Sequence, residues 1–387
     1  MPSCGGPSRV ATDLAEIWSR RLAALRGWNP VLHQAVIVGF NRNTDLVRRL
    51  GAGEVPRLLG SLPAEIARLL EADLAGSRSV ERHVGPDLEP TLQALGPFEA
   101  AVGGQAGIVG EVVRTLGGRP IDLTGQPRDV PHYVFEFGEA PGRSAGRIIL
   151  SASQGLEPPP LTAISEALAA GADSAFVSGF HLMDPAVIRR CGRHLLRLRS
   201  ADVPVHIELG ASGPAVLDAL RTLLPLADSV GANEAEARHL VGVAGGALRD
   251  LLDPLREFVR QNLVARLHVH LDGMQLALTE APRTEEPRGL LLAGAAAAEV
   301  AGTGRVAPSL RETGGFPAGD IERFARAIDS LGGDPATGQV GKDAILVPSA
   351  LVPSPRRVVG LGDVLSSVAF LARARHIKGR AGDSESE

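Results

Sequence analysis

The chain has 387 residues, of which 44% are hydrophobic and 22% are charged. At about 150 residues per domain, this length predicts two or three structural units, and the composition argues against wholesale disorder and against a fibrous repeat. The 40 basic residues nearly balance the 44 acidic ones, which leaves a net charge of −4, and the basic residues do not gather in a stripe. Nucleic acid is therefore not expected as a partner.

Targeting and membrane segments are not expected either. The longest apolar run, residues 289–298, is well below the roughly 20 residues that a membrane span needs. The first 14 residues lack the basic and apolar regions of a signal peptide, and Cys4 and Cys191 are the only cysteines. We expect a soluble protein of a reducing, cytoplasmic compartment with no membrane partner. The residues give no indication of the oligomeric state.

Short β-branched runs alternate along the chain with longer stretches of helical periodicity. This alternation is typical of a parallel sheet covered by helices on both faces, and such sheets bind ligands at the carboxyl ends of their strands. Strands are predicted at residues 35–40, 174–179, 204–209 and 267–271, and helices at 14–25, 185–199 and 215–226.

Two segments, 44–100 and 119–153, interrupt this alternation because they are richer in Pro, Gly and short alternating stretches. We interpret them as a smaller β-containing lid domain that leaves the main sheet and returns to it. The large α/β domain would then comprise residues 1–43, 101–118 and 154–387. Both ends of the chain are expected to be peripheral.

The sequence Gly360-Leu361-Gly362-Asp363 precedes an apolar helical stretch. A Gly-rich turn that opens a helix presents free N–H groups and the positive end of the helix dipole, so it can hold a phosphoryl group. An aspartate at that turn could accept the proton of an attacking hydroxyl group. The same spacing fits an aspartate that only caps a helix, and both interpretations stay open.

Two further motifs place carboxylates at expected strand ends. Asn233 and Glu236 share one face of a first helical turn, where they could approach a hydrated magnesium ion or form a capping box. Glu208, in the sequence His206-Ile207-Glu208, lies near the end of a buried strand, where a carboxylate needs a cation or hydrogen-bond donors. A single histidine such as His206 is more often a core residue than a ligand.

Polar side chains suited to sugar hydroxyls follow the first strand. Residues 43–45 read Asn-Thr-Asp, and residues 103–107 read Gly-Gly-Gln-Ala-Gly before a helical stretch. Carboxylates and amides at strand ends suit bidentate hydrogen bonds to vicinal hydroxyls, although each stretch is by itself also a turn signal. His132 and Arg147, in the lid segment, carry little information alone.

In chain order, these motifs resemble the ADP-dependent glucokinase/phosphofructokinase family, a branch of the ribokinase-like kinases. The resemblance extends from about residue 35 to 375, and the order and spacing of the motifs carry it. It implies a three-layer α/β/α large domain with a smaller discontinuous β-containing lid domain. The matching stretches are residues 38–45, 103–108, 131–137, 206–209, 228–236, 268–279 and 359–370.

The resemblance also implies roles for individual residues, with ADP as the phosphoryl donor and Mg²⁺ or another hard divalent cation as cofactor. Asp363 matches the catalytic base, and Glu208 and Glu236 match the positions that organise the magnesium through water. Further matches are Gly360, Leu361 and Gly362 to the anion hole, Arg147 to the arginine at the donor's terminal phosphate, Val352 to the adenine pocket, and Asn43, Asp45, Gly104, Gln105 and His132 to sugar-contacting positions.

The expected phosphoryl acceptor is inferred from Glu81. It aligns with a glutamate that glucose-using members place against the sugar, and a carboxylate there would repel a 6-phosphate. Fructose 6-phosphate would need a cationic cradle, but Lys342 and Lys378 are the only lysines and neither is near the lid, which leaves arginines such as Arg143. We expect magnesium-dependent transfer of the terminal phosphoryl group of ADP to the 6-hydroxyl of glucose.

Three alternatives remain at this stage. The acceptor could be fructose 6-phosphate, as in the ADP-dependent phosphofructokinases. It could instead be a specialised sugar, nucleoside or cyclitol, with ATP as a possible donor. A sugar- or nucleotide-sensing module without turnover is the non-enzymatic alternative, and the joint presence of Asp363, Glu208, Glu236 and Arg147 argues against it.

Overall fold

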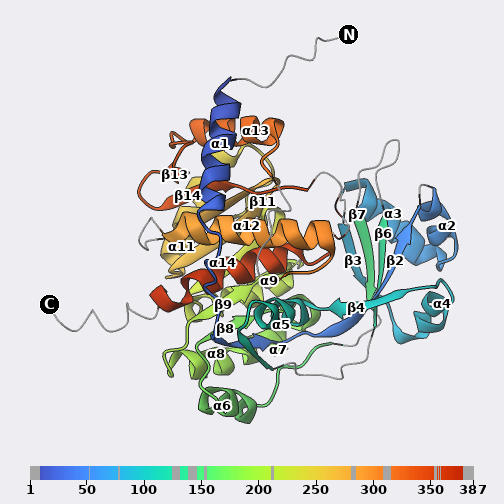
Figure 1. Cartoon of the computed structure of the whole chain (residues 1–387). Coiled ribbons are helices and arrows are strands. Elements are labelled where there is room, and N and C mark those ends of the chain that lie inside the picture. Colours follow the sequence, from blue (N-terminus) through green and yellow to red (C-terminus); the bar gives the residue numbers. More distant parts are fainter. Residues whose placement is uncertain are drawn as a thin grey trace, which may run out of the picture.

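Two β-sheets organise the chain (Figure 1). The computed structural model describes residues 9–51, 53–76, 79–123, 131–137, 146–151, 155–210, 213–279, 285–307, 315–352, 355, 357 and 359–377. Within these residues, no helix is both long and apolar enough to span a bilayer.

The larger sheet has nine strands in the described part of the chain, in the order β13-β14-β12-β11-β10-β9-β8-β1-β5. The strands from β11 to β5 run parallel, and β12, β14 and β13 add an antiparallel edge. Their bounds are β1 Ala35–Gly39, β5 Arg119–Asp122, β8 Ser174–Val177, β9 Val205–Glu208, β10 Ser229–Asn233, β11 Arg266–Leu271, β12 Met274–Thr279, β13 Gln339–Val340 and β14 Ala344–Pro348.

Helices cover both faces of this sheet, and its strands β1, β8 and β9 are buried along their whole length. One face contacts α5 (Gln105–Thr115), α12 (Glu285–Thr303) and α14 (Leu361–Ile377), and the other contacts α8 (Gly192–Arg199), α10 (Glu234–Val241) and α11 (Leu248–Gln261). The remaining elements of this part are α1 Arg9–Ala23, α6 Leu161–Ala169, α7 Pro185–Arg190, α9 Pro214–Arg221, α13 Ala318–Ser330 and the 3-10 turns η2 Phe180–Leu182 and η3 Leu224–Leu226.

The smaller sheet has five strands in the described residues, in the order β3-β7-β6-β2-β4. Figure 1 shows it at one side of the large sheet, with α2, α3 and α4 on its outer side. The bounds are β2 Asn43–Leu50, β3 Ser79–His83, β4 Glu99–Gly103, β6 His132–Phe137, β7 Gly146–Ser151, α2 Glu54–Gly60, α3 Ala64–Gly76, α4 Glu89–Gln93 and the 3-10 turn η1 Pro86–Leu88.

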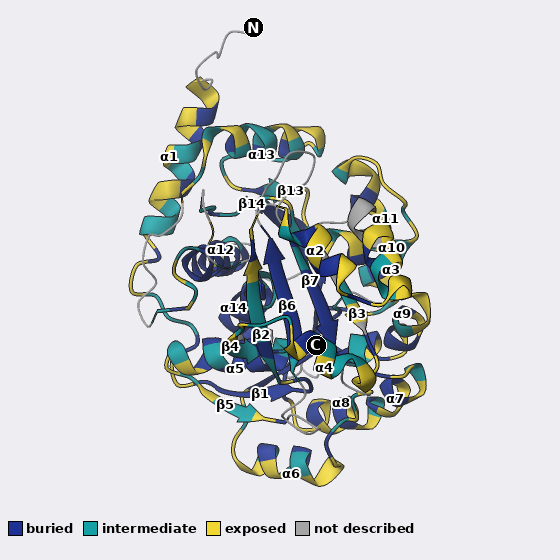
Figure 2. Cartoon of the chain, turned by 90° about the vertical axis from the view of Figure 1, so that its right-hand side faces the viewer, coloured by how far each residue is buried: buried dark blue, intermediate teal, exposed yellow. Residues whose placement is uncertain are grey.

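Side chains alternate between the two faces of the small sheet. Along β6, Tyr133, Phe135 and Phe137 pack into a core with the three outer helices, while Val134 packs on the other face against Val359 of the large unit. Figure 2 shows β6 and β7 as buried strands at the middle of this sheet, whereas β2 and β4 are more exposed. The inner face is thus free to present polar side chains toward the large sheet.

Two strands join a different sheet from the one that the predicted domain boundaries implied. Residues 119–122 were expected in the lid but form β5, which pairs in parallel with β1 at the edge of the large sheet. The short strand contains Pro120, which an edge strand tolerates and which made the segment resemble a lid connection. Conversely, β4 ends at Gly103 and pairs with β2 in the small sheet. The division into two domains stays a proposal.

Two local predictions also change. The helix expected at 185–199 is divided into α7 and α8 at Cys191. The N-terminal segment is not peripheral throughout, because Trp18 of α1 is fully buried with its ring edge-on to Phe324 of α13 at 5.6 Å. The Trp18 Nε1–H donates to the carbonyl oxygen of Pro335 at 3.2 Å, which ties α1 to the large unit.

Candidate active site

A cavity of about 180 Å³ lies between the two sheets. The part of the chain that forms the nine-stranded sheet, here called the large unit, contributes residues at the ends of β1, β8, β9, β10 and β11 and at the starts of α5 and α14. The small sheet lines it from β2, β3, β6 and β7. This is the edge at which parallel strands end and where such sheets bind ligands.

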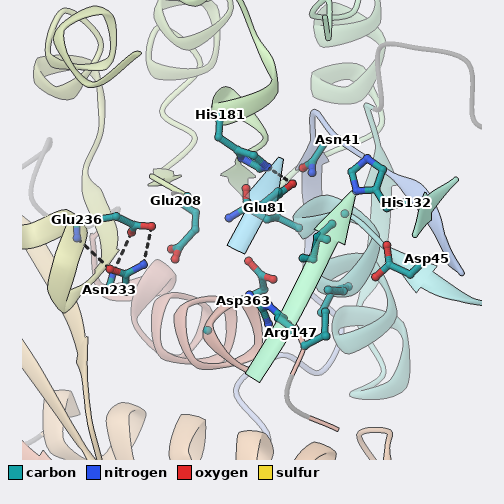
Figure 3. Close-up of a pocket in the computed structure, with 18 of the residues that line it drawn as sticks. Asn41, Asp45, Glu81, His132, Arg147, His181, Glu208, Asn233, Glu236 and Asp363 are labelled. Carbon is teal, nitrogen blue, oxygen red and sulfur yellow. Dashed lines mark hydrogen bonds and ion pairs between the residues drawn. The ribbon is translucent and has the colours of Figure 1, made fainter. Parts of the chain in front are cut away.

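Most of the residues predicted from separate motifs meet in this cavity (Figure 3). Asn43, Leu361 and Val352 do not line it, although Asn43 touches a residue that does. Arg143 lies outside the described residues. The predicted residues that line the cavity are Asp45, Glu81, Gly104, Gln105, His132, Arg147, Glu208, Glu236, Gly360, Gly362 and Asp363.

Asp363 lies in the first turn of α14 and is not its cap. The helix begins at Leu361, and Gly360 precedes it with a φ of 76°, which a residue with a Cβ rarely adopts. A Cβ at Gly360 would also approach Ile108 Cδ1 to 2.5 Å. The N–H groups of the first helical residues have no partner inside the helix, so Leu361, Gly362 and Asp363 can present them to an anion.

The Asp363 carboxyl group is surrounded by groups that shift its acidity in both directions. Burial and the nearby Glu208 carboxylate raise its pKa to about 7, against a hydrogen bond from Gln105 and the charges of Arg147 and His181. Gln105 Oε1 accepts a hydrogen bond from the N–H of Gly179 at 3.0 Å. The amide NH₂ of Gln105 is therefore the group available to donate to Asp363, and a carboxyl group with this pKa suits a general base near neutral pH.

Glu208 is buried at the end of β9 and receives hydrogen bonds from its surroundings. His206 Nε2 lies 3.0 Å from Glu208 Oε2, and Ser366 also bonds to this carboxyl group. Burial raises the pKa of Glu208 to about 8. Gly231, its neighbour on β10, makes room for the carboxylate, since a Cβ there would lie 1.9 Å from Oε2.

The capping-box interpretation of Asn-x-x-Glu is confirmed at Glu236, and a role in holding magnesium stays a prediction. Asn233 and Glu236 form a capping box: the Glu236 N–H donates to Asn233 Oδ1, and the Asn233 N–H donates to Glu236 Oε2, each at 2.9 Å. Both side chains nevertheless line the cavity. Burial, with the negative charge of Glu208, raises the pKa of Glu236 to about 7.

These carboxylates fit a hydrated divalent cation. Among the described residues, no group of three His, Cys, Asp or Glu side chains is placed to hold a metal ion directly. Magnesium, however, keeps several waters and is commonly bound through one or two carboxylates together with substrate phosphates. Glu208 and Glu236 face one cavity and disfavour each other's ionisation, and a cation between them would relieve that repulsion.

The polar groups of the small sheet form the opposite wall. Asp45 Oδ1 accepts a hydrogen bond from Asn43 Nδ2 at 2.7 Å, so Asn43 orients Asp45 from outside the cavity. Burial raises the pKa of Asp45 to about 7, opposed by the positive charge of Arg357. Gly103 adjoins this pair, because a Cβ there would lie 1.9 Å from Asp45 Oδ1.

Glu81 makes an ion pair with His181, whose Nε2 lies 3.5 Å from Glu81 Oε1. Burial alone would raise the pKa of Glu81, but His181, His132 and Arg147 hold it at about 2. The same contact raises the pKa of His181, although burial opposes the charged ring. Glu81 is therefore an anion at neutral pH.

The motifs did not predict three polar residues of the cavity: Asn41, His181 and His270. Each follows or ends a strand of the large sheet, and this position is the sequence feature from which they could have been predicted. His181 lies beyond the end of β8, two residues after Gly179, which has a φ of 87°. His270 ends the alternation His268-x-His270 on β11, and its Nε2 lies 2.7 Å from Ser366 Oγ.

Solved structures share this fold. An ADP-dependent kinase in complex with fructose-6-phosphate and ADPβS matches with a TM-score of 0.70, over 97% of this chain and 99% of that chain, at 16% sequence identity. The fold is thus a ribokinase-like three-layer α/β/α large part with a smaller β-containing part, which confirms the predicted fold class.

Sequence comparisons then identify the family. The ADP-specific phosphofructokinase/glucokinase conserved region matches residues 162–372, more than half of the chain. The chain belongs to this family of ADP-dependent sugar kinases, which confirms the resemblance found in the motifs.

Two curated relatives have the same name, ADP-dependent glucose/glucosamine kinase. The one from Pyrococcus furiosus is 29% identical over 195 residues, which cover 45% of this chain and 42% of that protein. The one from Pyrococcus abyssi is 24% identical over 431 aligned positions, which cover 88% of this chain and 94% of that protein. The chain therefore matches less than half the length of the first relative and nearly all of the second.

Proposed function

We propose that the protein is a magnesium-dependent kinase that transfers the terminal phosphoryl group of ADP to the 6-hydroxyl of glucose. One observation carries the proposal: Asp363, at the N-terminus of α14, faces the same cavity as the polar residues of the small sheet. A base beside an anion-binding helix start, opposite groups that suit sugar hydroxyls, is the arrangement that phosphoryl transfer to a sugar requires.

In this proposal each group of residues has a separate role. Asp363 accepts the proton of the sugar hydroxyl while the new O–P bond forms and the bond from the terminal phosphorus to the bridging oxygen of ADP breaks, which releases AMP. The N–H groups of residues 361–363 and the Arg147 guanidinium stabilise charge on the transferred group. Glu208 and Glu236 would hold magnesium through water, which would neutralise the phosphate oxygens. The small sheet would exclude water and so suppress hydrolysis of ADP.

The charge of the cavity supports a neutral acceptor. Glu81 is ionised at neutral pH and lines the cavity. A sugar 6-phosphate would approach this carboxylate against its repulsion. Lys342 lies between β13 and β14, outside the cavity, and Lys378 lies beyond the described residues. The names of the two curated relatives point to the same acceptor class.

Replacing Glu81 by alanine should lower kcat/KM for glucose by about 10- to 100-fold, because a charge-assisted hydrogen bond to the sugar contributes about 1.5–3 kcal/mol. The same change should raise the ratio of activity with fructose 6-phosphate to activity with glucose, since it removes a repulsive charge. Steady-state kinetics with both sugars measure this ratio. Glu99→Ala, an exposed change on β4 of the same sheet, is the control. A wild-type preference for fructose 6-phosphate would overturn the acceptor assignment.

Replacing Gln105 by leucine should move the acidic limb of the kcat pH profile to higher pH. The hydrogen bond from Gln105 lowers the pKa of Asp363, so its loss raises that pKa and leaves less ionised base at a given pH. We expect a shift of about one unit, the size of one such bond. Profiles of kcat for both proteins from pH 5 to 9 give the comparison. An unshifted limb would mean that Asp363 does not control it.

A further inference from the structure

A chain of buried polar side chains lies behind Glu208. It runs from Arg266 on β11 through Ser229 on β10 to His206 on β9, and each of these residues is 2% exposed or less. Arg266 Nη1 donates to Ser229 Oγ at 3.2 Å, and Ser229 Oγ lies 2.9 Å from His206 Nδ1. His206 Nε2 lies 3.0 Å from Glu208 Oε2.

Strand register places these side chains side by side. Ser229 is the direct neighbour of His206 on one side and of Arg266 on the other. Two residues further along, Gly231 is the neighbour of Glu208, and its missing side chain leaves the space that the carboxylate occupies. Because residues i and i+2 of a strand share a face, all these groups lie on one face of the sheet.

The donors and acceptors in this chain can be assigned from chemistry. An arginine side chain has donors only, so Ser229 Oγ must accept from Arg266. Among the described residues, His206 Nδ1 is the one acceptor that Ser229 Oγ contacts, so the buried hydroxyl proton of Ser229 is satisfied only when Nδ1 is the unprotonated nitrogen of a neutral ring. The ring proton lies on Nε2, from which it is donated to Glu208.

The surroundings keep the ring neutral and in place. His206 is enclosed between Phe176 and Phe370, with ring centroids 4.6 Å and 5.0 Å away. Arg266 is itself anchored by Glu286, whose Oε1 lies 2.9 Å from Nε and 2.8 Å from Nη2. A charged imidazole would be unfavourable for two reasons. It would lose its hydration between the two phenyl rings, and the Arg266 guanidinium would repel it.

We propose that Ser229 and Arg266 are positioning residues that fix the Nε2–H tautomer of His206 and thereby hold Glu208 toward the cavity. Without the Ser229 hydroxyl group, Nδ1 loses its donor and the ring can carry its proton on either nitrogen. In the Nδ1–H tautomer, the Nε2 lone pair would face Glu208 and repel its ionised form, which is the form that would hold a cation. The consequence for turnover rests on the proposed function, whereas the tautomer does not.

Nitrogen NMR of the ¹⁵N-histidine-labelled protein tests the tautomer directly, with the His206 signals assigned by their loss in His206→Gln. We expect wild-type His206 to be protonated at Nε2 alone, and Ser229→Ala to give a mixture of tautomers. Ser229→Thr, which keeps the hydroxyl group, should retain the wild-type tautomer. Ser174→Ala is the matched control, because Ser174 is also buried at the start of a strand of this sheet and its Oγ has no hydrogen-bond partner among the described residues.

Kinetics supply the second readout. Ser229→Ala should lower kcat by about 10- to 100-fold, the usual effect of losing a residue that orients a ligand, with the KM for the sugar unchanged. Ser229→Thr should restore most of the rate. A wild-type His206 protonated at Nδ1, or an unchanged tautomer in Ser229→Ala, would overturn the proposal. The wild-type NMR spectrum requires neither turnover nor a folded variant. Absence of kinase activity would therefore refute the proposed function and would leave the tautomer proposal to be decided by the spectrum.

Discussion

Replacing Asp363 by asparagine should lower phosphotransfer by about 10²- to 10⁴-fold, the range that a general base contributes. Asparagine keeps the shape of the side chain but cannot accept the hydroxyl proton. Binding of ADP should change little, because the helix N–H groups and Arg147 remain. Rates of AMP formation and calorimetric titration with ADP measure the two effects. Asp320→Asn, in the first turn of α13 and outside the cavity, is the matched control.

The same substitution should stabilise the protein, and more so at high pH. Burial raises the pKa of Asp363 from 3.8 to about 7. Between these values the unfolded chain is ionised while the folded chain keeps the proton, so the wild-type free energy of unfolding falls as pH rises. We expect Asp363→Asn to be more stabilising at pH 8 than at pH 5 by about 1 to 2 kcal/mol, after allowance for solvent screening. Urea unfolding at both pH values measures the difference. Equal effects would show that Asp363 ionises normally.

The second large effect is expected at Gly103. An alanine Cβ there would lie 1.9 Å from Asp45 Oδ1 and 2.6 Å from Asn43 Nδ2, so both side chains must move. Asp45 would then leave its place in the cavity. We expect kcat/KM for glucose to fall by about 100-fold, which corresponds to two hydrogen bonds to a charged group. The loss should appear mainly in the KM for glucose and not in the KM for ADP.

Gly60→Ala is the control for this change. Gly60 ends α2 in the same part of the molecule, and a Cβ there meets nothing within 4 Å. It should leave both KM values unchanged and stabilise the protein slightly, because alanine restricts the unfolded chain more than glycine does. An active Gly103→Ala protein with a wild-type KM for glucose would show that Asp45 does not contact the sugar.

Sequence reasoning succeeded where chain geometry leaves little freedom. Asp363, Glu208 and Glu236 belong to motifs far apart in the chain, yet each lies at a strand end or a helix start on one edge of the sheet. Because parallel strands end at a common edge, such motifs converge without knowledge of the packing.

The missed features depend on tertiary contacts. His181 enters the site because it pairs with Glu81 from the other sheet, and no local pattern encodes that pair. Ser229 and Arg266 gain their proposed role only from the register of three neighbouring strands. The strand at 119–122 was assigned to the lid because a short segment with a proline lacks the apolar pattern of a central strand.

AMP release tests the proposed activity most directly. The purified protein would be incubated with ADP and magnesium, with glucose, with fructose 6-phosphate or with no acceptor, and Asp363→Asn would be run in parallel. We predict AMP formation that requires glucose and falls by about 10²- to 10⁴-fold in the variant. AMP formed only with fructose 6-phosphate would contradict the acceptor. Absence of AMP with every acceptor, while ATP gave ADP in the same mixtures, would contradict the donor, and absence of product from both nucleotides would contradict the kinase itself.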